Sequence, residues 1–430
     1  MKKLVFTIIA VGLGFLLANA QSETQSFDVD GIKVIFKPTS KNVINIRLYF
    51  RGGVTNYMAN KAGIENLALQ SVVRCGSEKY SVKAVKDTTD NYDILLSGAA
   101  ALDYGYVQLN CISKYFNQGW AVFSDAIMTP AFEPHETDLL KKEIIEFHKE
   151  YLANPENRLF ELQRQDAFRN TAYAINPTGT EETLSDLTAA DIANYYKSIL
   201  NKNRIFIVVV GNVTKQDLYE KIISALDNIP SRPYSPVEIQ APVLKGNTLI
   251  KENGNFSTNY FGAVMNAPEY TSIYYVPFRM GITGIGGNLY QYLRSNRSLS
   301  YSPGSGVYNL RVPYAEMDAG TTNPKEAISG MLKVLKEVQT DGLNEEWLQH
   351  IKNSYLTQSY INDQSASAIT NSLGLAEVLG GWQYAEDLPK LVQMVTVEQV
   401  NSALNTYIAG LKWTYVGNTD EIEGYKPPAY

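Results

Sequence analysis

The sequence predicts an α+β protein built from two copies of one unit. Strand-like and helix-like segments come in blocks rather than in strict alternation, which is typical of the α+β class. A buried-strand pattern at Ile205–Asn212, closing on Gly-Asn, recurs at Trp413–Asn418, 206 residues later. A helix start at Leu187–Ile192 recurs at Val395–Val400, 208 residues later. Two landmarks that keep nearly the same offset indicate an internal repeat.

The elements of the first half follow from their residue patterns. Val43–Phe50 alternates as a strand and ends at Arg51-Gly52-Gly53. Within a second strand region, Val107, Leu109 and Cys111 alternate inward as in a half-buried strand. The remaining patterns predict helices at 62–74, 81–91, 115–127, 137–151 and 156–168, with strands across 94–113. The second half repeats this order less clearly.

A proline-rich stretch separates the two halves. Four prolines fall in thirteen residues, at 230, 233, 236 and 242, and such a stretch cannot continue a helix or a central strand. We therefore expect a first domain at 21–229, a linker at 230–245 and a second domain at 246–430.

The amino-terminal residues have the features of an export signal. Lys2 and Lys3 precede an apolar stretch from Leu4 to Ala18, and Ala18-Asn19-Ala20 is a small-x-small cleavage site. We expect cleavage after Ala20 and a periplasmic or secreted protein; the alternative, an uncleaved anchor, would need a longer apolar stretch of ~20 residues. No later stretch is apolar enough for stable membrane insertion.

The composition argues against nucleic acid as a partner and does not decide whether the two cysteines are bonded. The formal net charge is −6 with no basic run, so we expect no nucleic-acid binding. The two cysteines, Cys75 and Cys111, could form a disulfide after export or be two small core side chains, which is the interpretation we favour.

One short segment has the frame of a zinc-peptidase helix without its chemistry. A helix with His-x-x-Glu-His offers two imidazoles to the metal and a carboxylate to the metal-bound water. In the segment Gly63 to Gln70, the three corresponding places hold Asn66, Leu69 and Gln70. Leucine neither binds zinc nor accepts a proton, and carboxamides are poor zinc ligands beside imidazole.

The repeated unit, this Gly-Ile-led helix and the linker together resemble the insulinase-like (inverzincin) zinc peptidases over about Ser26 to Tyr425. The resemblance implies two homologous α/β-sandwich domains, each an antiparallel-rich sheet with helices packed on it, arranged as a clam shell. It also implies a third metal position at Glu146, with 75 residues between it and Gln70. Glu146 shares its helix face with Glu143 and Glu150, so a solvated acidic stripe also explains it.

We expect no metal and no catalytic residue in this chain. The three histidines, His135, His148 and His350, lack metal-ligand spacing and are interpreted as ordinary surface residues. Whether the chain takes part in catalysis then depends on a complex with another chain.

Within the resemblance, the second half retains a positive signal. A Gly-x-x-Leu-x-x-x-Leu-Arg segment ends at Arg294, and Tyr301 follows seven residues later, as in the family's non-catalytic subunits of the two-chain bacterial type. There, an arginine donates to substrate carbonyls and a tyrosine to the developing oxyanion. Arg297 is a rival for the arginine role, and a purely structural pair is the alternative.

Two functions follow as hypotheses. The first is a non-catalytic subunit of an exported heterodimeric zinc metallopeptidase, which closes the chamber and binds extended, unfolded peptides through Arg294 and Tyr301. A homologous partner chain would carry His-x-x-Glu-His and the zinc. The second is a catalytically inactive binding or scaffold protein with the peptidase fold, with or without self-association.

Overall fold

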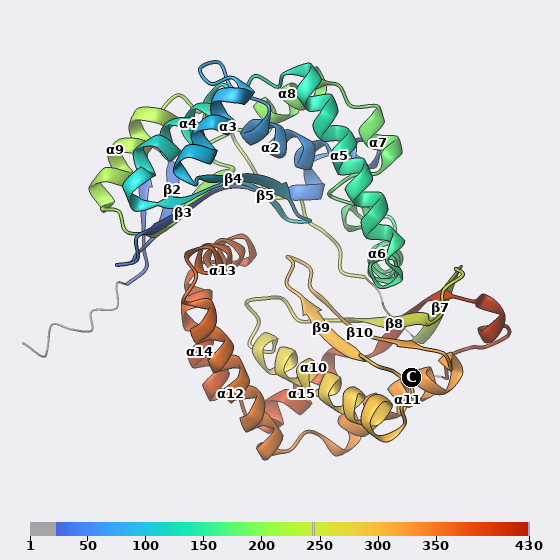
Figure 1. Ribbon diagram of the computed structural model, residues 1–430. Helices are drawn as coiled ribbons and strands as arrows, with labels where there is room; N and C mark the ends of the chain where they lie inside the picture. The colour runs from blue at the N-terminus through green and yellow to red at the C-terminus, as the bar shows by residue number, and fades with distance from the viewer. Residues whose placement is uncertain (1–22, 243, 245, 429–430) are drawn as a thin grey trace, which may run out of the picture.

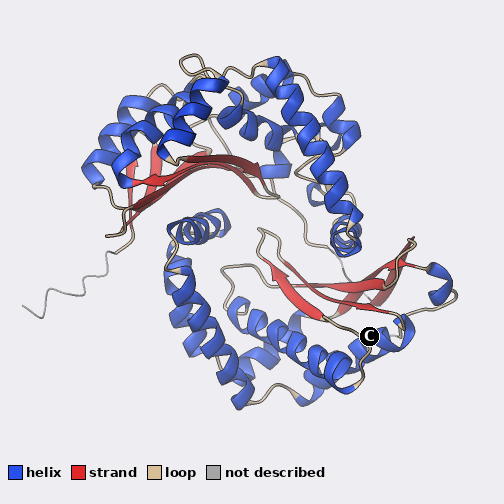
Figure 2. Ribbon diagram, in the orientation of Figure 1, coloured by secondary structure: helices blue, strands red, loops and turns tan. Residues whose placement is uncertain are grey.

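The computed structural model describes residues 23–428 except 243 and 245 (Figure 1), so the predicted signal peptide at 1–20 lies outside the described residues. The chain folds into two units, each a mixed sheet with helices on its outer face (Figure 2). The predicted α+β class and the clam-shell pair of homologous sandwich units are confirmed. Among the described residues, no helix has the length and apolar character to cross a membrane.

Most elements of the first unit lie within one to three residues of the predicted bounds. They are β1 (Gln25–Val29), β2 (Ile32–Pro38), β3 (Val43–Arg51), η1 (Gly53–Asn56), η2 (Ala59–Lys61), α2 (Ile64–Arg74), α3 (Val82–Tyr92), β4 (Leu95–Ala100), β5 (Tyr104–Ile112), η3 (Ser113–Tyr115), α4 (Phe116–Met128), α5 (Pro134–Ala153), α6 (Pro155–Ala167), η4 (Ala172–Ala174), α7 (Glu181–Ser185), α8 (Ala189–Ile199), β6 (Ile205–Gly211) and α9 (Lys215–Leu226). The strands β1 and β2, the helices α7 and α9 and the short 3₁₀ segments η1 to η4 were not among the predicted elements.

The second unit begins after a stretch, 230–242, in which the structure has no helix or strand. Its elements are β7 (Gly246–Asn253), β8 (Asn259–Asn266), α10 (Tyr275–Leu289), the π-helical η5 (Tyr290–Asn296), β9 (Gly304–Tyr308), β10 (Tyr314–Thr321), α11 (Pro324–Asp341), α12 (Glu345–Asn362), α13 (Ala366–Leu379), α14 (Gln383–Met394), α15 (Val397–Tyr407), β11 (Gly410–Gly417) and η6 (Thr419–Ile422).

The two sheets have one topology. The first has the order β1-β2-β6-β3-β5-β4 and the second β7-β11-β8-β10-β9, so each strand after β1 has a counterpart in the same place. The pairs β2–β6 and β7–β11 are parallel, and the other pairs of each sheet are antiparallel. The internal repeat predicted from two sequence landmarks is therefore a repeat of the whole sheet.

Those landmarks also have the same local structure in both copies. Thr188 and Thr396 both form capping boxes, in which the threonine side chain and the third helical residue each accept a backbone N–H. Gly211 and Gly417 end equivalent strands with φ of 157° and 156°. A Cβ at Gly211 would lie 2.5 Å from the Val43 carbonyl oxygen, so the strand end has room only for glycine.

Each unit places one helix against the inner face of the other unit's sheet. Helix α13 packs on β3 and β6, and α6 packs on β8 and β11 (Figure 1). At the first contact Leu373 joins the buried rings of Tyr49 and Phe206, and a Cβ at Gly374 would lie 2.2 Å from the Tyr49 ring. Glu377 on α13 completes the contact. The two halves are thus held by apolar packing and by buried charge pairing.

The ion pairs of Glu377 join helix α13 to the strands β2 and β3. Its carboxylate, only 6% exposed, lies 2.8 Å from the Lys33 amine and 2.7 Å from the Arg51 guanidinium. A second interdomain pair joins Lys37 and Glu386 at 3.0 Å.

Two side-chain interpretations are settled by burial. Cys75 and Cys111 are both buried and both are free thiols, so the disulfide alternative is wrong and the core interpretation holds.

His148 is buried, with Nδ1 3.4 Å from the Thr178 hydroxyl, so its interpretation as a surface residue is wrong. Burial also lowers the pKa of His148. His148 is covered in part by Thr178, which is 30 residues further along the chain, and helical spacing alone does not reveal such a contact.

Candidate functional site

The segment with the zinc-helix frame forms α2, which lies across β4 and β5. The helix begins after Gly63, whose φ is +87° and whose added Cβ would lie 2.7 Å from the Gly179 Cα atom. A close backbone contact with the loop before α7 thus requires glycine at this position.

The first of the three changed positions is bound into the sheet. Asn66 is buried, and its Oδ1 accepts from the Ala100 backbone N–H at 3.3 Å and from the Gln70 side-chain amide at 3.2 Å. The two carboxamides that occupy the histidine positions therefore bond to each other and to the end of β4. The oxygen that could face a cation is already used as an acceptor.

The second changed position is part of the hydrophobic core. Leu69 is 0% exposed and belongs to the main apolar cluster of the first unit. It packs where β4 and β5 carry glycines: an added Cβ at Gly98 would lie 2.1 Å from the Leu69 carbonyl oxygen, and one at Gly105 would lie 2.3 Å from its Cδ1. The buried leucine side chain has no group that can accept a proton.

Glu146 lies on α5. Its side chain is 74% exposed and its carboxylate is 3.2 Å from Lys149, which also pairs with Glu181 at 3.1 Å. The neighbouring Glu143 pairs with Arg74 of α2 at 2.6 Å. Within the described part of the chain no three His, Cys, Asp or Glu side chains form a group that could hold a metal ion.

A buried polar cluster beside Asn66 escaped the sequence analysis. Glu65 is 0% exposed; its Oε2 accepts from the Tyr195 hydroxyl and from the Asn56 amide at 2.9 Å, while its Oε1 has no hydrogen-bond partner. Arg204 donates to the Asn56 side-chain oxygen and to the Arg51 carbonyl at 3.0 Å. The signal in the sequence was a charged residue, Glu65, directly after Gly63-Ile64 at the start of a helix.

Burial raises the pKa of Glu65 to about 7, although the hydrogen bonds from Tyr195 and Asn56 and the charge of Arg204 act in the opposite direction. An unfolded glutamate has a pKa near ~4.3. Below about pH 4 the carboxyl is protonated in both states and contributes nothing to the pH dependence. Between about pH 4 and pH 7 the folded state keeps the Glu65 proton while the unfolded state releases it, so the free energy of unfolding falls as pH rises. Above pH 7 both states have lost the proton and the free energy of unfolding falls no further on this account.

We therefore expect Glu65→Gln to gain stability relative to the wild type as pH rises. The gain between pH 4 and pH 8 should be about 3 kcal/mol, at ~1.36 kcal/mol for each unit of pKa shift. Urea unfolding of both proteins at a series of pH values measures it. Titratable groups that both proteins contain cancel in the stability difference between them. One such group is Glu316, because burial raises its pKa to about 8. Glu146→Gln is the matched exposed control; a pH-independent difference for Glu65→Gln would refute the expectation.

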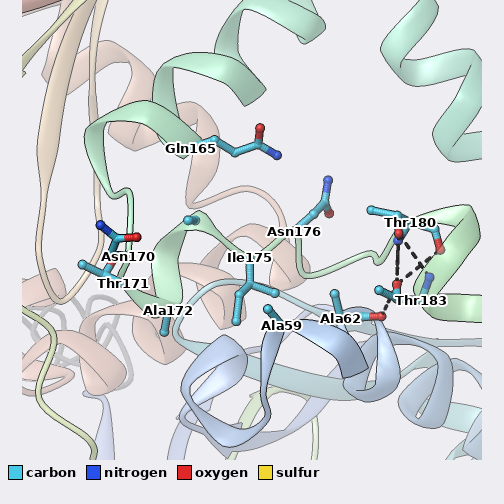
Figure 3. Close-up of a pocket in the computed structure, with 11 residues that line it drawn as sticks. Ala59, Ala62, Gln165, Asn170, Thr171, Ala172, Ile175, Asn176, Thr180 and Thr183 are labelled. Carbon is cyan, nitrogen blue, oxygen red and sulfur yellow. Dashed lines mark hydrogen bonds between the residues drawn. The ribbon is translucent and has the colours of Figure 1, made fainter.

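A pocket of about 510 Å³ opens beside the start of α2. Ala59 and Ala62 form one wall, and Figure 3 shows Gln165 and Asn176 extending toward the same space from α6 and from the loop before α7. Its lining consists of methyl, hydroxyl and carboxamide groups and includes no charged side chain. Such a pocket can take a neutral polar group but offers neither a nucleophile nor an acid–base pair.

The second unit brings Arg294 and Tyr301 together. The guanidinium carbon of Arg294 lies 4.2 Å from the centroid of the Tyr301 ring and 4.9 Å from that of Tyr290. Tyr301 is 78% exposed. Between the pair, the chain leaves η5 and turns back through Ser298, whose φ is 53°, with the Leu299 N–H donating to the Leu293 carbonyl at 2.7 Å.

Arg297 lies in a different environment. Its guanidinium pairs with Glu326 at 3.4 Å and lies 5.2 Å from the centroid of the Tyr292 ring. Among the described residues, by contrast, no carboxylate pairs with the side chain of Arg294. Arg294 therefore has free N–H groups beside an exposed phenol, whereas Arg297 is engaged with a helix of its own unit.

Two family models match the chain. Insulinase (Peptidase family M16) matches residues 33–181, and Peptidase M16 inactive domain matches residues 186–355. A relative from Helicobacter pylori, the "Non-peptidase homolog YmxG", is 20% identical over 438 residues, which cover 97% of this chain and 99% of that protein.

Solved structures show the same fold. The peptidase M16 inactive domain from Pseudomonas fluorescens has a TM-score of 0.83 at 18% identity, over 92% of this chain and 98% of that one. The periplasmic protease PqqL from Escherichia coli has a TM-score of 0.77 at 14% identity, over 93% of this chain and 47% of that one. This chain thus matches about half of PqqL, and at these identities the similarity concerns the fold alone.

Proposed function

Because the chain belongs to the insulinase-like peptidase family M16, we propose that it is the non-catalytic subunit of an exported heterodimeric zinc metallopeptidase. A homologous partner chain carries His-x-x-Glu-His and the zinc. This chain closes the chamber around an unfolded peptide and presents Arg294 and Tyr301 to it. Its place is the periplasm or the cell exterior, because the first twenty residues have the features of a cleaved export signal.

The observation that carries the proposal is the contact of Arg294 with an exposed Tyr301 in a chain whose metal positions hold no ligand. Stacking on the phenol orders the guanidinium while its N–H groups remain free to donate to backbone carbonyls. The Tyr301 hydroxyl can donate to an oxygen that becomes negative in a tetrahedral intermediate. Arg294 also lies in a π-helical turn, a geometry that is rare and frequent at functional sites.

The changed metal helix supports inactivity of the isolated chain. Activating water needs a metal and a nearby base, and at the corresponding positions the chain has two carboxamides bonded to each other and one buried leucine. The chemistry is then supplied in trans, and this chain contributes binding and electrostatic stabilisation.

A mixing experiment tests the proposal. The purified mature chain and its proposed partner, the product of a neighbouring reading frame with His-x-x-Glu-His, are assayed separately and together on a quenched unfolded peptide. We expect little cleavage by either chain alone and strong cleavage by the mixture. Equal activity of the partner alone and of the mixture would refute the subunit role, and cleavage by this chain alone would refute its inactivity.

A second function, an inactive scaffold that self-associates, is favoured by one surface feature. Leu139, Phe147 and Tyr151 are exposed on α5 at spacings of eight and four residues, so they lie on a common face of the helix. Apolar faces of this kind are used in protein contacts. A stable dimer of the isolated chain by light scattering, lost in Phe147→Ser, together with no activity in the mixing experiment, would favour the scaffold over the subunit.

A further inference from the structure

A cleft of about 910 Å³ between the two units has no role in the function proposed above. Residues of helices α10, α12, α13 and α14 of the second unit form most of its wall, and Glu23, Thr24 and Lys37 line it from the first unit. Figure 1 shows where these four helices lie. The size of the cleft is within the range of about 300–1,000 Å³ typical of ligand sites. The cleft shares no lining residue with the pocket beside α2 or with the Arg294–Tyr301 contact.

The cleft contains one cation without a counter-ion. Arg279 on α10 is half-buried in its wall, and its guanidinium carbon lies 5.5 Å from the centroid of the Tyr355 ring. Among the described residues no carboxylate lies within ion-pair distance of Arg279. The other cation of the lining, Lys37, is neutralised by Glu386 at 3.0 Å. A partly desolvated arginine of this kind favours an anionic ligand group.

Two amides of the lining, Asn309 and Asn371, are also oriented as donors. The side-chain oxygen of Asn309 accepts from the Tyr275 hydroxyl, and that of Asn371 accepts from the Arg47 guanidinium at 2.8 Å. Because each oxygen is occupied, each side-chain NH₂ group remains to donate. The wall therefore offers donors to a ligand that is rich in acceptors, such as a carboxylate followed by backbone carbonyls.

Aromatic rings and aliphatic side chains together provide the apolar part of the wall. Tyr270 is buried, with its ring centroid 4.8 Å from that of Tyr275 and 4.8 Å from that of Tyr384. Tyr355 lies under Arg279. Rigid tyrosine faces bind aromatic and apolar side chains with little loss of conformational entropy.

The remaining charges of the lining restrict the ligand further. Glu23 and Asp363 are exposed carboxylates in the lining of the cleft. They repel a ligand that carries several negative charges, such as a nucleotide, and tolerate one whose single anionic group is at one end. We propose that this interdomain cleft binds the carboxyl terminus of a peptide, with the terminal carboxylate on Arg279, its last carbonyls at Asn309 and Asn371, and an apolar last side chain on the tyrosine wall.

This site is independent of the subunit role proposed above. Arg279 and Arg294 are fifteen residues apart, which corresponds to about 22 Å along a helix at ~1.5 Å per residue. The cleft is formed within one chain, so its ligand binds without a partner subunit or zinc. Failure of either proposal leaves the other standing.

Calorimetric titration of the isolated mature chain tests the cleft. The probes are the acetylated tetrapeptide Ala-Ala-Ala-Phe with a free carboxyl terminus and the same peptide with a carboxyl-terminal amide. We expect the free acid to bind at least about tenfold more tightly, because hydrogen bonds to charged groups are worth ~1.5–3 kcal/mol, or a factor of roughly 10 to 150. The same loss is expected for the free acid on Arg279→Gln, with partial recovery in Arg279→Lys.

Arg297→Gln is the matched control, since Arg297 is an exposed arginine of the same unit outside the cleft. It should bind the free acid as the wild type does. Equal affinity for acid and amide, or no binding of the acid at about 1 mM, overturns the proposal without any variant. Inorganic phosphate that competes as well as the peptide also overturns it, because the site would then recognise any small anion.

Discussion

Exchange of Tyr301 for phenylalanine is expected to lower the kcat of peptide cleavage by the two-chain complex by about 10²–10³-fold, with a small change in KM. Removal of one oxyanion donor has an effect of this size in other hydrolases. The interaction strengthens as the carbonyl oxygen becomes negative, so its loss falls on the transition state rather than on substrate binding. Because phenylalanine retains the ring beside the Arg294 guanidinium, the exchange removes only the hydroxyl.

The arginines separate the two candidate roles. Arg294→Gln should mainly raise KM, since the guanidinium donates to carbonyls already present in the bound substrate. Arg297→Gln should have no such effect, because that side chain pairs with Glu326 at 3.4 Å. Full activity of Tyr301→Phe in the mixture, or a larger loss in Arg297→Gln than in Arg294→Gln, would contradict the assignment. Assembly of each variant with the partner is checked by size-exclusion chromatography.

Local sequence signals were sufficient for the repeat. The strand-ending glycines Gly211 and Gly417 recur as residue types in the sequence, although the atoms that exclude a Cβ there belong to other strands. The capping threonines Thr188 and Thr396 depend only on residues within three positions. Such features are encoded by short-range sterics and hydrogen bonding, and they recur wherever the unit recurs. The helix bounds of the first unit followed from periodicity for the same reason.

Long-range contacts were not accessible in this way. The hydrogen bond from Tyr195 to Glu65 joins residues 130 positions apart, and α13 reaches the inner face of a sheet formed more than 150 residues earlier. Periodicity marks which face of an element is apolar but does not identify what covers it. The burial of His148 and the unpaired Arg279 likewise depend on segments that only the fold brings near.

The candidate site was partly accessible. The spacing of Arg294 and Tyr301 suggested a pair, but their contact depends on a π-helical turn and on a positive φ at Ser298, for which serine gives no strong signal. At the changed metal helix, the residue types could be read from the sequence, whereas their burial depends on the packing of α2 against β4 and β5. Asn66 and Leu69 proved to be bound into the sheet and core of the first unit.

Leu69→Glu, which restores the carboxylate of the peptidase motif, is expected to lower the free energy of unfolding by about 4 kcal/mol or more at pH 8. Burial without a partner raises the pKa of a carboxyl by several units, each worth ~1.36 kcal/mol, and the leucine packing is lost as well. The glycines at 98 and 105 let the sheet lie directly against this side chain, which is 0% exposed, so bulk water does not reach a charge placed there. The loss should be smaller at pH 5, where the carboxyl is protonated in the folded state.

Two control variants separate charge from packing in this test. Leu69→Met keeps the volume and should cost less than about 1.5 kcal/mol. Gln70→Glu adds the same charge one residue further along α2 at a half-buried position, so it should be far less destabilising than Leu69→Glu. Urea unfolding at pH 5 and pH 8 measures all three; equal stability of Leu69→Glu and the wild type at pH 8 would show that this position is open to solvent. The expected loss means that a return to the zinc motif requires repacking of the sheet contact as well as new ligands.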